Sequence, residues 1–207
     1  MAQSGASVLS SGWIEDGKAL DVHFTGDAAV VRAAVEGAFD RTDAIVQKTA
    51  DRARSLIIAD MDSTMITIEC IDELADYAGI KPQIAEVTER AMRGELDFEE
   101  ALRSRVALLK GLSENVIDQC LVERVVIMPG ARALVQTIRA HGGMAILVSG
   151  GFTRFADPVA SEIGFNKAIA NRLGIKDGML TGRVEGNIVG AQTKRKTLID
   201  TLSAYEL

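Results

Sequence analysis

The sequence predicts an α/β fold, a Rossmann-like parallel sheet with a helical-bundle cap inserted after the first core strand. Two apolar runs, Leu56–Ala59 and 144–148, support the sheet, because strands buried on both faces of a parallel sheet are apolar throughout. From about residue 69 to 126 the periodicity is helical. A helical insert between two buried strands indicates a sheet that carries a cap.

Three regions follow from this pattern. Residues 1–52 are expected to form a small N-terminal β-α-β segment, residues 53–68 and 127–207 the core, and residues 69–126 the cap. In the first region "ALDVHF" alternates like a strand, Asp27 is a candidate helix cap, and "DAIVQ" (43–47) is a candidate second strand.

The remaining elements are predicted in chain order. The cap pattern breaks at "GIKP", "RGELD" and "GLSE", which indicates four short helices. A helix over 131–143 precedes the second strand, a hairpin is expected around Asp177 and Gly178, and a final helix follows over 192–207. Its buried face is expected to contain Leu198, Ile199, Leu202 and Tyr205.

The charge and the cysteine content narrow the kinds of partner and compartment expected for the protein. With 23 basic and 29 acidic residues the net charge is −6, which argues against a nucleic-acid or membrane-surface partner. Two cysteines, Cys70 and Cys120, favour a reducing compartment. No run reaches membrane-spanning length. A cytoplasmic location is expected.

Two carboxylates, Asp60 and Asp62, follow the first strand. Residues two apart in an extended chain point the same way, so the pair needs a shared proton or a cation, and Mg²⁺ suits such oxygen ligands. A strand-end turn with solvated acids is the alternative. A calcium loop is excluded, because Met65 and Ile71 stand where it needs Gly and Glu.

The second strand ends in Ser149, Gly150 and Gly151. The hydroxyl and glycine backbone N–H groups suit a phosphate, although a plain turn has the same composition. Further on, "TKRK" offers three basic residues. Helical periodicity turns the last lysine away from the expected buried face, and does not choose between Lys194 and Arg195.

In the cap, Arg105 falls within an apolar helical stripe that contains Leu102 and Val106. A guanidinium there is costly unless an anion meets it. Either its head reaches water while its stem lies on the core, or it binds a substrate carboxylate.

The run D-M-D-S-T after an apolar strand resembles the first motif of the haloacid-dehalogenase superfamily, and "MAILVSGGF" resembles its second. The resemblance implies that Asp60 is the nucleophile and a metal ligand, and that Asp62 is the acid/base and a second ligand of Mg²⁺. It also implies that Ser149 and Gly150 bind phosphate, and it favours Lys194 as the catalytic lysine.

Residues 55–207, with "DMDSTMITIECIDELA", "AMRGELDFEEALRSRVALLKGL" and "ANRL", are similar to phosphoserine phosphatases. That resemblance implies hydrolysis of O-phospho-L-serine through an aspartyl-phosphate, the last step of serine biosynthesis. Glu69 would bind the amino group and Arg105 the carboxylate, while Met92 and Phe98 would wall off the site. Residues 1–52 weakly resemble the remnant of a regulatory domain.

The family's fourth motif, which supplies a further metal ligand, is absent, because the chain contains no Gly-Asp-Gly. Impaired turnover is therefore expected, as is self-association through an open strand edge or as a homodimer. The alternatives are a phosphatase or phosphotransferase for another small metabolite, and a non-catalytic folded fragment.

Overall fold

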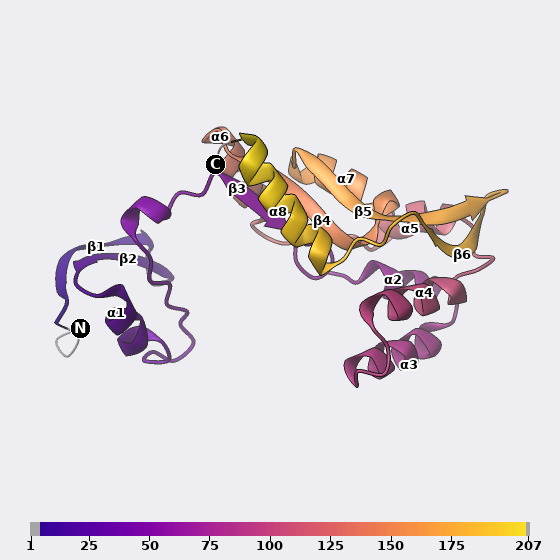
Figure 1. Cartoon of the computed structure of the whole chain (residues 1–207), viewed down its shortest axis with the longest axis horizontal. Helices are drawn as coiled ribbons and strands as arrows, with labels where there is room; N and C mark the ends of the chain where they lie inside the picture. Colours follow the sequence, from indigo (N-terminus) through magenta and orange to yellow (C-terminus); the bar gives the residue numbers. More distant parts are fainter. Residues whose placement is uncertain (1–4, 206–207) are drawn as a thin grey trace. The chain divides into compact units, whose positions relative to one another are not determined.

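The computed structural model describes residues 5–205, and the chain divides into two compact units between Arg54 and Ser55. The first unit contains two strands, a helix and a short 3₁₀ turn: β1 (Ser7–Glu15), β2 (Ala19–Thr25), α1 (Ala28–Val35) and Thr49–Asp51. The second unit contains all the remaining elements (Figure 1).

The first unit is β-β-α in order, so the predicted β-α-β arrangement is wrong. Strands β1 and β2 form an antiparallel hairpin, and Asp27 caps α1 by accepting a hydrogen bond from the Ala29 N–H at 2.7 Å. Residues 43–47 form no strand. Instead Val46 is buried and its carbonyl accepts a hydrogen bond from Arg32 of α1, so this segment packs against the helix rather than in a sheet.

The second unit is built on a four-stranded sheet of order β3-β4-β5-β6. Its strands are β3 (Leu56–Ala59), β4 (Met144–Phe152), β5 (Lys167–Lys176) and β6 (Met179–Glu185). Strands β3, β4 and β5 are parallel, and β6 is antiparallel to β5 across the predicted hairpin. The carboxyl ends of β3 and β4 therefore lie side by side, which brings the two predicted motifs to one edge.

Four helices separate β3 from the next core helix, as the sequence predicts. They are α2 (Cys70–Tyr77), α3 (Lys81–Met92), α4 (Phe98–Leu108) and α5 (Asn115–Glu123). Helix α4 begins with a capping box in which Asp97 and Glu100 each accept a hydrogen bond from the other's backbone N–H. Arg124, after α5, pairs with Glu73 and Asp76 of α2. These contacts hold the cap helices to one another.

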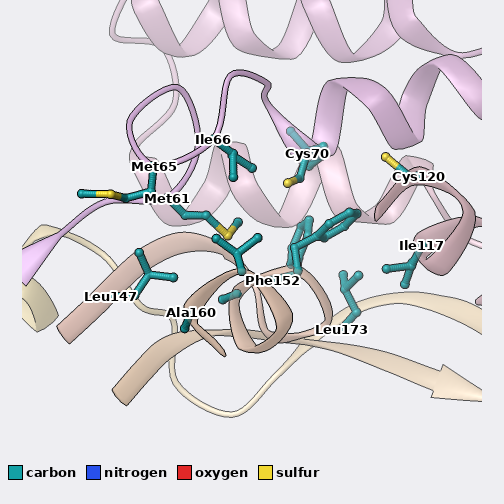
Figure 2. Packing of buried hydrophobic residues seen from close by; sticks show 14 of the residues in the cluster. Met61, Met65, Ile66, Cys70, Ile117, Cys120, Leu147, Phe152, Ala160 and Leu173 are labelled. Atoms are coloured by element: carbon teal, nitrogen blue, oxygen red, sulfur yellow. The ribbon is translucent and has the colours of Figure 1, made fainter. Parts of the chain in front are cut away.

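One large apolar cluster joins cap and core. It combines residues of the acidic loop and α2, such as Met61 and Cys70, with β4 and α7 residues such as Phe152 and Ala160 (Figure 2). A smaller cluster contains Ile146 and Val148. Because side chains alternate along β4, this strand is buried on both faces, as its all-apolar sequence predicts.

Helices α6 (Ala131–Ala140) and α7 (Thr153–Ile163) flank β4, and α8 (Ala191–Tyr205) lies over β3 and β4 (Figure 1). The predicted buried face of α8 is wrong at three of its four residues, because Leu198, Ile199 and Tyr205 are 41%, 47% and 58% exposed, whereas Leu202 is half-buried. The helix instead turns Thr201 inward. The predicted last two residues of this helix lie outside the described residues.

No helix within residues 5–205 combines the length and apolar character needed to cross a bilayer.

Candidate active site

The acidic loop after β3 turns tightly around one carbonyl. The Met61 carbonyl accepts hydrogen bonds from the N–H groups of Thr64, Met65 and Ile66. Met61 itself is fully buried, whereas its neighbours Asp60 and Asp62 both line a cavity of about 660 Å³. The alternation expected of extended chain therefore holds, and the two carboxylates face the same space.

The loop at the end of β4 meets the acidic loop. A Cβ atom at Gly151 would lie 2.8 Å from Asp62 Oδ2 and 3.1 Å from Ser149 Oγ, so a side chain at this position would displace the Asp62 carboxylate. The Gly151 N–H donates to Ser149 Oγ at 2.8 Å. That N–H is therefore occupied, contrary to the expectation that both glycines offer theirs to an anion, but the Ser149 hydroxyl proton remains available to donate to a ligand.

Lys194 completes the group from the first turn of α8. Its Nζ lies 2.5 Å from Asp60 Oδ2, while the other oxygen of Asp60 accepts a hydrogen bond from the Met61 N–H. Arg195 is exposed, and Lys196 pairs with Asp200 on the surface. Of the two basic residues that helical periodicity left open, Lys194 and Arg195, the structure brings Lys194 to the carboxylates.

Asp60 and Asp62 have different surroundings although only one residue separates them. Burial, with a smaller contribution from the nearby Glu69 charge, raises the pKa of Asp62 to about 6. Asp60, by contrast, is 41% exposed and is paired with a cation. A carboxyl group with a pKa near neutrality can hold or release a proton during a reaction.

The opposite side of the cavity comes from the cap. Arg105 lines it from α4, and within the described residues its guanidinium has only a long contact, 3.4 Å from Nε to the Ala101 carbonyl. Its neighbour Arg103 faces outward and pairs with Glu99. An arginine that faces a cavity without a carboxylate partner among residues 5–205 is suited to bind an anionic group.

Phe98 packs directly on the core. A Cβ atom at Gly150 would lie 2.9 Å from its ring, and one at Gly190 would lie 3.2 Å away. Phe98 therefore lines the cavity, and its ring lies against two glycines from different loops. Met92 does not line the cavity and is 84% exposed, so the structure does not place it with the other predicted residues.

Glu69 also lines the cavity, at the residue before α2. Its carboxylate accepts a hydrogen bond from the Ser63 hydroxyl at 2.6 Å, and it caps no backbone N–H of the helix. Ser63 has a positive φ of 51°, an uncommon conformation for a residue other than glycine. The turn thus directs a hydroxyl toward Glu69.

Several lining residues were not predicted. Gly190, Gln192 and Thr193 belong to the approach and first turn of α8. A glycine before a helix can indicate that another side chain packs closely against the backbone there. The sequence alone does not identify that side chain at Gly190 as Phe98.

The donor set fits a hard divalent cation in part. Asp60 and Asp62 supply carboxylate oxygens on one tight turn, and Mg²⁺ is commonly held by one or two carboxylates together with waters and substrate phosphate. Within residues 5–205 no cluster of three or more His, Cys, Asp or Glu side chains is arranged to hold a metal. Asp60 and Asp62 are therefore the two carboxylates that the acidic loop offers to a cation.

Comparisons with known proteins agree with this geometry. Residues 57–202 match the haloacid dehalogenase-like hydrolase family. Phosphoserine phosphatase of Vibrio cholerae is 41% identical over 189 residues, which cover 91% of this chain and 56% of that protein. Phosphoserine phosphatase of Haemophilus influenzae is 46% identical over 150 residues, covering 72% and 48% of the two chains.

A solved phospho-aspartyl intermediate analogue of phosphoserine phosphatase superposes with a TM-score of 0.68 at 35% identity, covering 75% of this chain and 74% of that one. The chain spans about half the length of the two relatives named above, 56% and 48%. The family match includes the acidic loop, the cap and the Lys194 helix. The chain therefore belongs to the haloacid dehalogenase-like hydrolase family.

Proposed function

We propose that this protein hydrolyses O-phospho-L-serine to L-serine and phosphate through an aspartyl-phosphate intermediate. The observation that carries the proposal is the convergence of Asp60, Asp62, Ser149 and Lys194 on one cavity that Arg105 faces from the cap. The similarity to phosphoserine phosphatases supports the choice of substrate.

In this proposal Asp60 attacks phosphorus and Asp62 protonates the leaving serine oxygen. The raised pKa of Asp62 supports its role as an acid, and the same group then accepts a proton from the water that hydrolyses the acyl phosphate. Lys194 and Ser149 would stabilise the charge on the phosphoryl oxygens. Asp60 and Asp62 would hold Mg²⁺, which supplies Lewis-acid polarisation of the phosphoryl group when bound.

The cap residues would select the amino-acid part of the substrate. Arg105 would bind the carboxylate through its planar guanidinium, and Glu69 would bind the ammonium group. The hydrogen bond from Ser63 supports this role, because it restricts the orientation of the Glu69 carboxylate. Phe98 would exclude water from the reacting groups.

The decisive experiment is a rapid-mixing measurement of acid-stable [³²P]phosphoryl transfer from O-phospho-L-serine to the protein, with Mg²⁺ and with EDTA. The expected result is a phosphorylated protein that forms in wild type and not in Asp60→Asn, followed by phosphate release. A phosphorylated protein that persists would indicate an impaired second step. Binding of substrate without any phosphoryl transfer would contradict the proposal.

A second candidate is a folded fragment that binds ligand without turnover. The observation in its favour is that no group of three or more potential metal ligands is found within the described residues. The expected weakening of Mg²⁺ binding and turnover stays a prediction, which a titration of turnover against Mg²⁺ concentration tests. A phosphatase or phosphotransferase for another phosphorylated metabolite is distinguished by the substrate comparison given in the Discussion.

We also propose that the protein self-associates through β3 and that it is cytoplasmic. Strand β3 pairs only with β4 among residues 5–205, and an unpaired apolar strand edge can pair with another chain. Both cysteines are free, in keeping with a reducing compartment. Light scattering is expected to detect dimers or larger species, and a strictly monomeric protein would contradict the edge proposal.

A further inference from the structure

Asn171 in β5 is a buried polar residue with an unusual set of partners. It is 1% exposed and it does not line the cavity. Its Oδ1 accepts a hydrogen bond from the Val189 N–H at 2.8 Å. Its Nδ2 donates to the Gly150 carbonyl at 2.8 Å and to the Val189 carbonyl at 3.4 Å. One amide therefore joins two backbone segments.

The first segment lies where the sheet loses its regular pairing. Val148 pairs with Ile169, but the next paired residue is Phe152, opposite Asn171. The three residues 149–151 thus bulge away from β5 and leave its regular hydrogen-bond ladder. The hydrogen bond from Asn171 to the Gly150 carbonyl replaces part of that pairing.

The second segment leads directly into the helix that carries Lys194. Val189 precedes Gly190, whose carbonyl accepts a hydrogen bond from the Lys194 N–H. Asn171 therefore connects the loop of Ser149 to the first turn of α8. Because the side chain makes all three bonds from inside the wall, it fixes the separation of these groups without touching a ligand.

We propose that Asn171 is a positioning residue that holds Ser149 and Lys194 at the spacing required to bind one phosphoryl group. This inference rests on the phosphate chemistry proposed above. Removal of the amide would free the two loops to separate, so that the two donors no longer converge on the same anion.

The chain contains a matched control. Asn166, just before β5, also uses its side chain to bond a backbone group of β4: its Oδ1 accepts from the Ala145 N–H at 2.9 Å. This bond lies at the opposite end of the strands from the cavity. Asn166→Ala and Asn171→Ala each remove hydrogen bonding from an asparagine side chain to the backbone of β4, at opposite ends of that strand.

The test compares the two variants by binding of inorganic phosphate, by kcat and KM on O-phospho-L-serine, and by thermal unfolding. Asn171→Ala is expected to weaken phosphate binding and to lower kcat/KM by about tenfold or more, the effect of losing one to two net hydrogen bonds. Asn166→Ala is expected to lower Tm but to leave phosphate affinity and kcat/KM within about twofold of wild type.

Asn171→Asp provides a second variant of the same shape. It keeps an acceptor for the Val189 N–H but loses the donor to Gly150, so it is expected to show the same phosphate defect. The inference is overturned if a folded Asn171 variant matches Asn166→Ala in phosphate affinity and kcat/KM. Phosphate binding without hydrolysis in wild type would refute only the proposed function, whereas no phosphate binding in wild type would refute both.

Discussion

The core wall of the cavity is tied together by bonds between segments far apart in the chain. Lys194 contacts Asp60 across 134 positions of sequence, and Asn171 donates to the Gly150 carbonyl across 21 positions. The core wall consists of Asp60, Asp62, Ser149, Gly150 and Lys194.

The cap wall, which consists of Glu69, Phe98 and Arg105, is held more loosely. Arg105 has a single long contact of 3.4 Å within the described residues, and Phe98 is 48% exposed although its ring reaches the core. The contrast suggests that groups which act on phosphorus need fixed geometry, whereas groups that select the rest of a substrate can adjust to it. Substitutions in the core wall should therefore lower turnover, whereas substitutions in the cap wall should change substrate choice.

The largest effect is expected for Asp60→Asn. Loss of the nucleophile should lower kcat by at least about 10⁴-fold, because no other group can form the covalent intermediate. Steady-state release of phosphate measures this, with Asp157→Asn, at an exposed position of α7, as the control. A variant that retains a tenth of wild-type kcat would show that the carboxylate does not attack phosphorus.

A smaller loss is expected for Lys194→Ala. Removal of a cation 2.5 Å from Asp60 should lower kcat by about 10²- to 10³-fold, as for loss of one group that stabilises transition-state charge. Lys196→Ala, on the same helix and paired only with Asp200, should be close to wild type. Equal effects of the two substitutions would contradict the assignment of Lys194.

Arg105→Ala is expected to affect substrate choice. Its kcat/KM on O-phospho-L-serine should fall by about 10- to 100-fold, the effect of losing a charged hydrogen-bond pair. Activity on O-phosphoethanolamine, which lacks the carboxylate, should change little. The exposed Arg103→Ala is the matched control. A parallel loss on both substrates would place Arg105 in the chemical step or in folding instead.

The smallest effect distinguishes Phe98 from Met92. Phe98→Ala removes a ring that touches the core and should raise KM by about 3- to 10-fold, as for loss of a packed apolar contact worth about 1 kcal/mol. Met92→Ala should stay within about twofold, because that side chain is 84% exposed and outside the cavity. A strong Met92 effect would indicate that α3 approaches the cavity during turnover.

The sheet, cap and core wall could be predicted because each has a local signal. All-apolar strands at 56–59 and 144–148 and paired aspartates at a strand end are visible in the sequence alone. Parallel pairing then brings the strand ends together. Two contacts could not be predicted, because both depend on the packing of distant segments: that of Asp62 with Gly151 and that of Phe98 with Gly190.

Other elements were missed for identifiable reasons. Helix α7 contains Pro158, which weakens a helical pattern, although its buried residues Phe155, Val159 and Ile163 keep helical spacing. In strand β1 the apolar residues stand in adjacent pairs, Val8 with Leu9 and Trp13 with Ile14, so the sequence shows no strand-like alternation. On α8 the buried side chain is Thr201 rather than Leu198, and a threonine within a helix carries no signal for the inward face.

The position of the Phe98 ring makes residues 98, 150 and 190 interdependent. The ring occupies the space that a side chain at Gly150 or Gly190 would need, so the tolerance of either glycine to substitution depends on the size of residue 98. Engineering toward bulkier phosphate esters would accordingly begin by replacing Phe98 with a smaller residue. A larger residue introduced first at Gly150 or Gly190 would displace the Phe98 ring from the edge of the cavity.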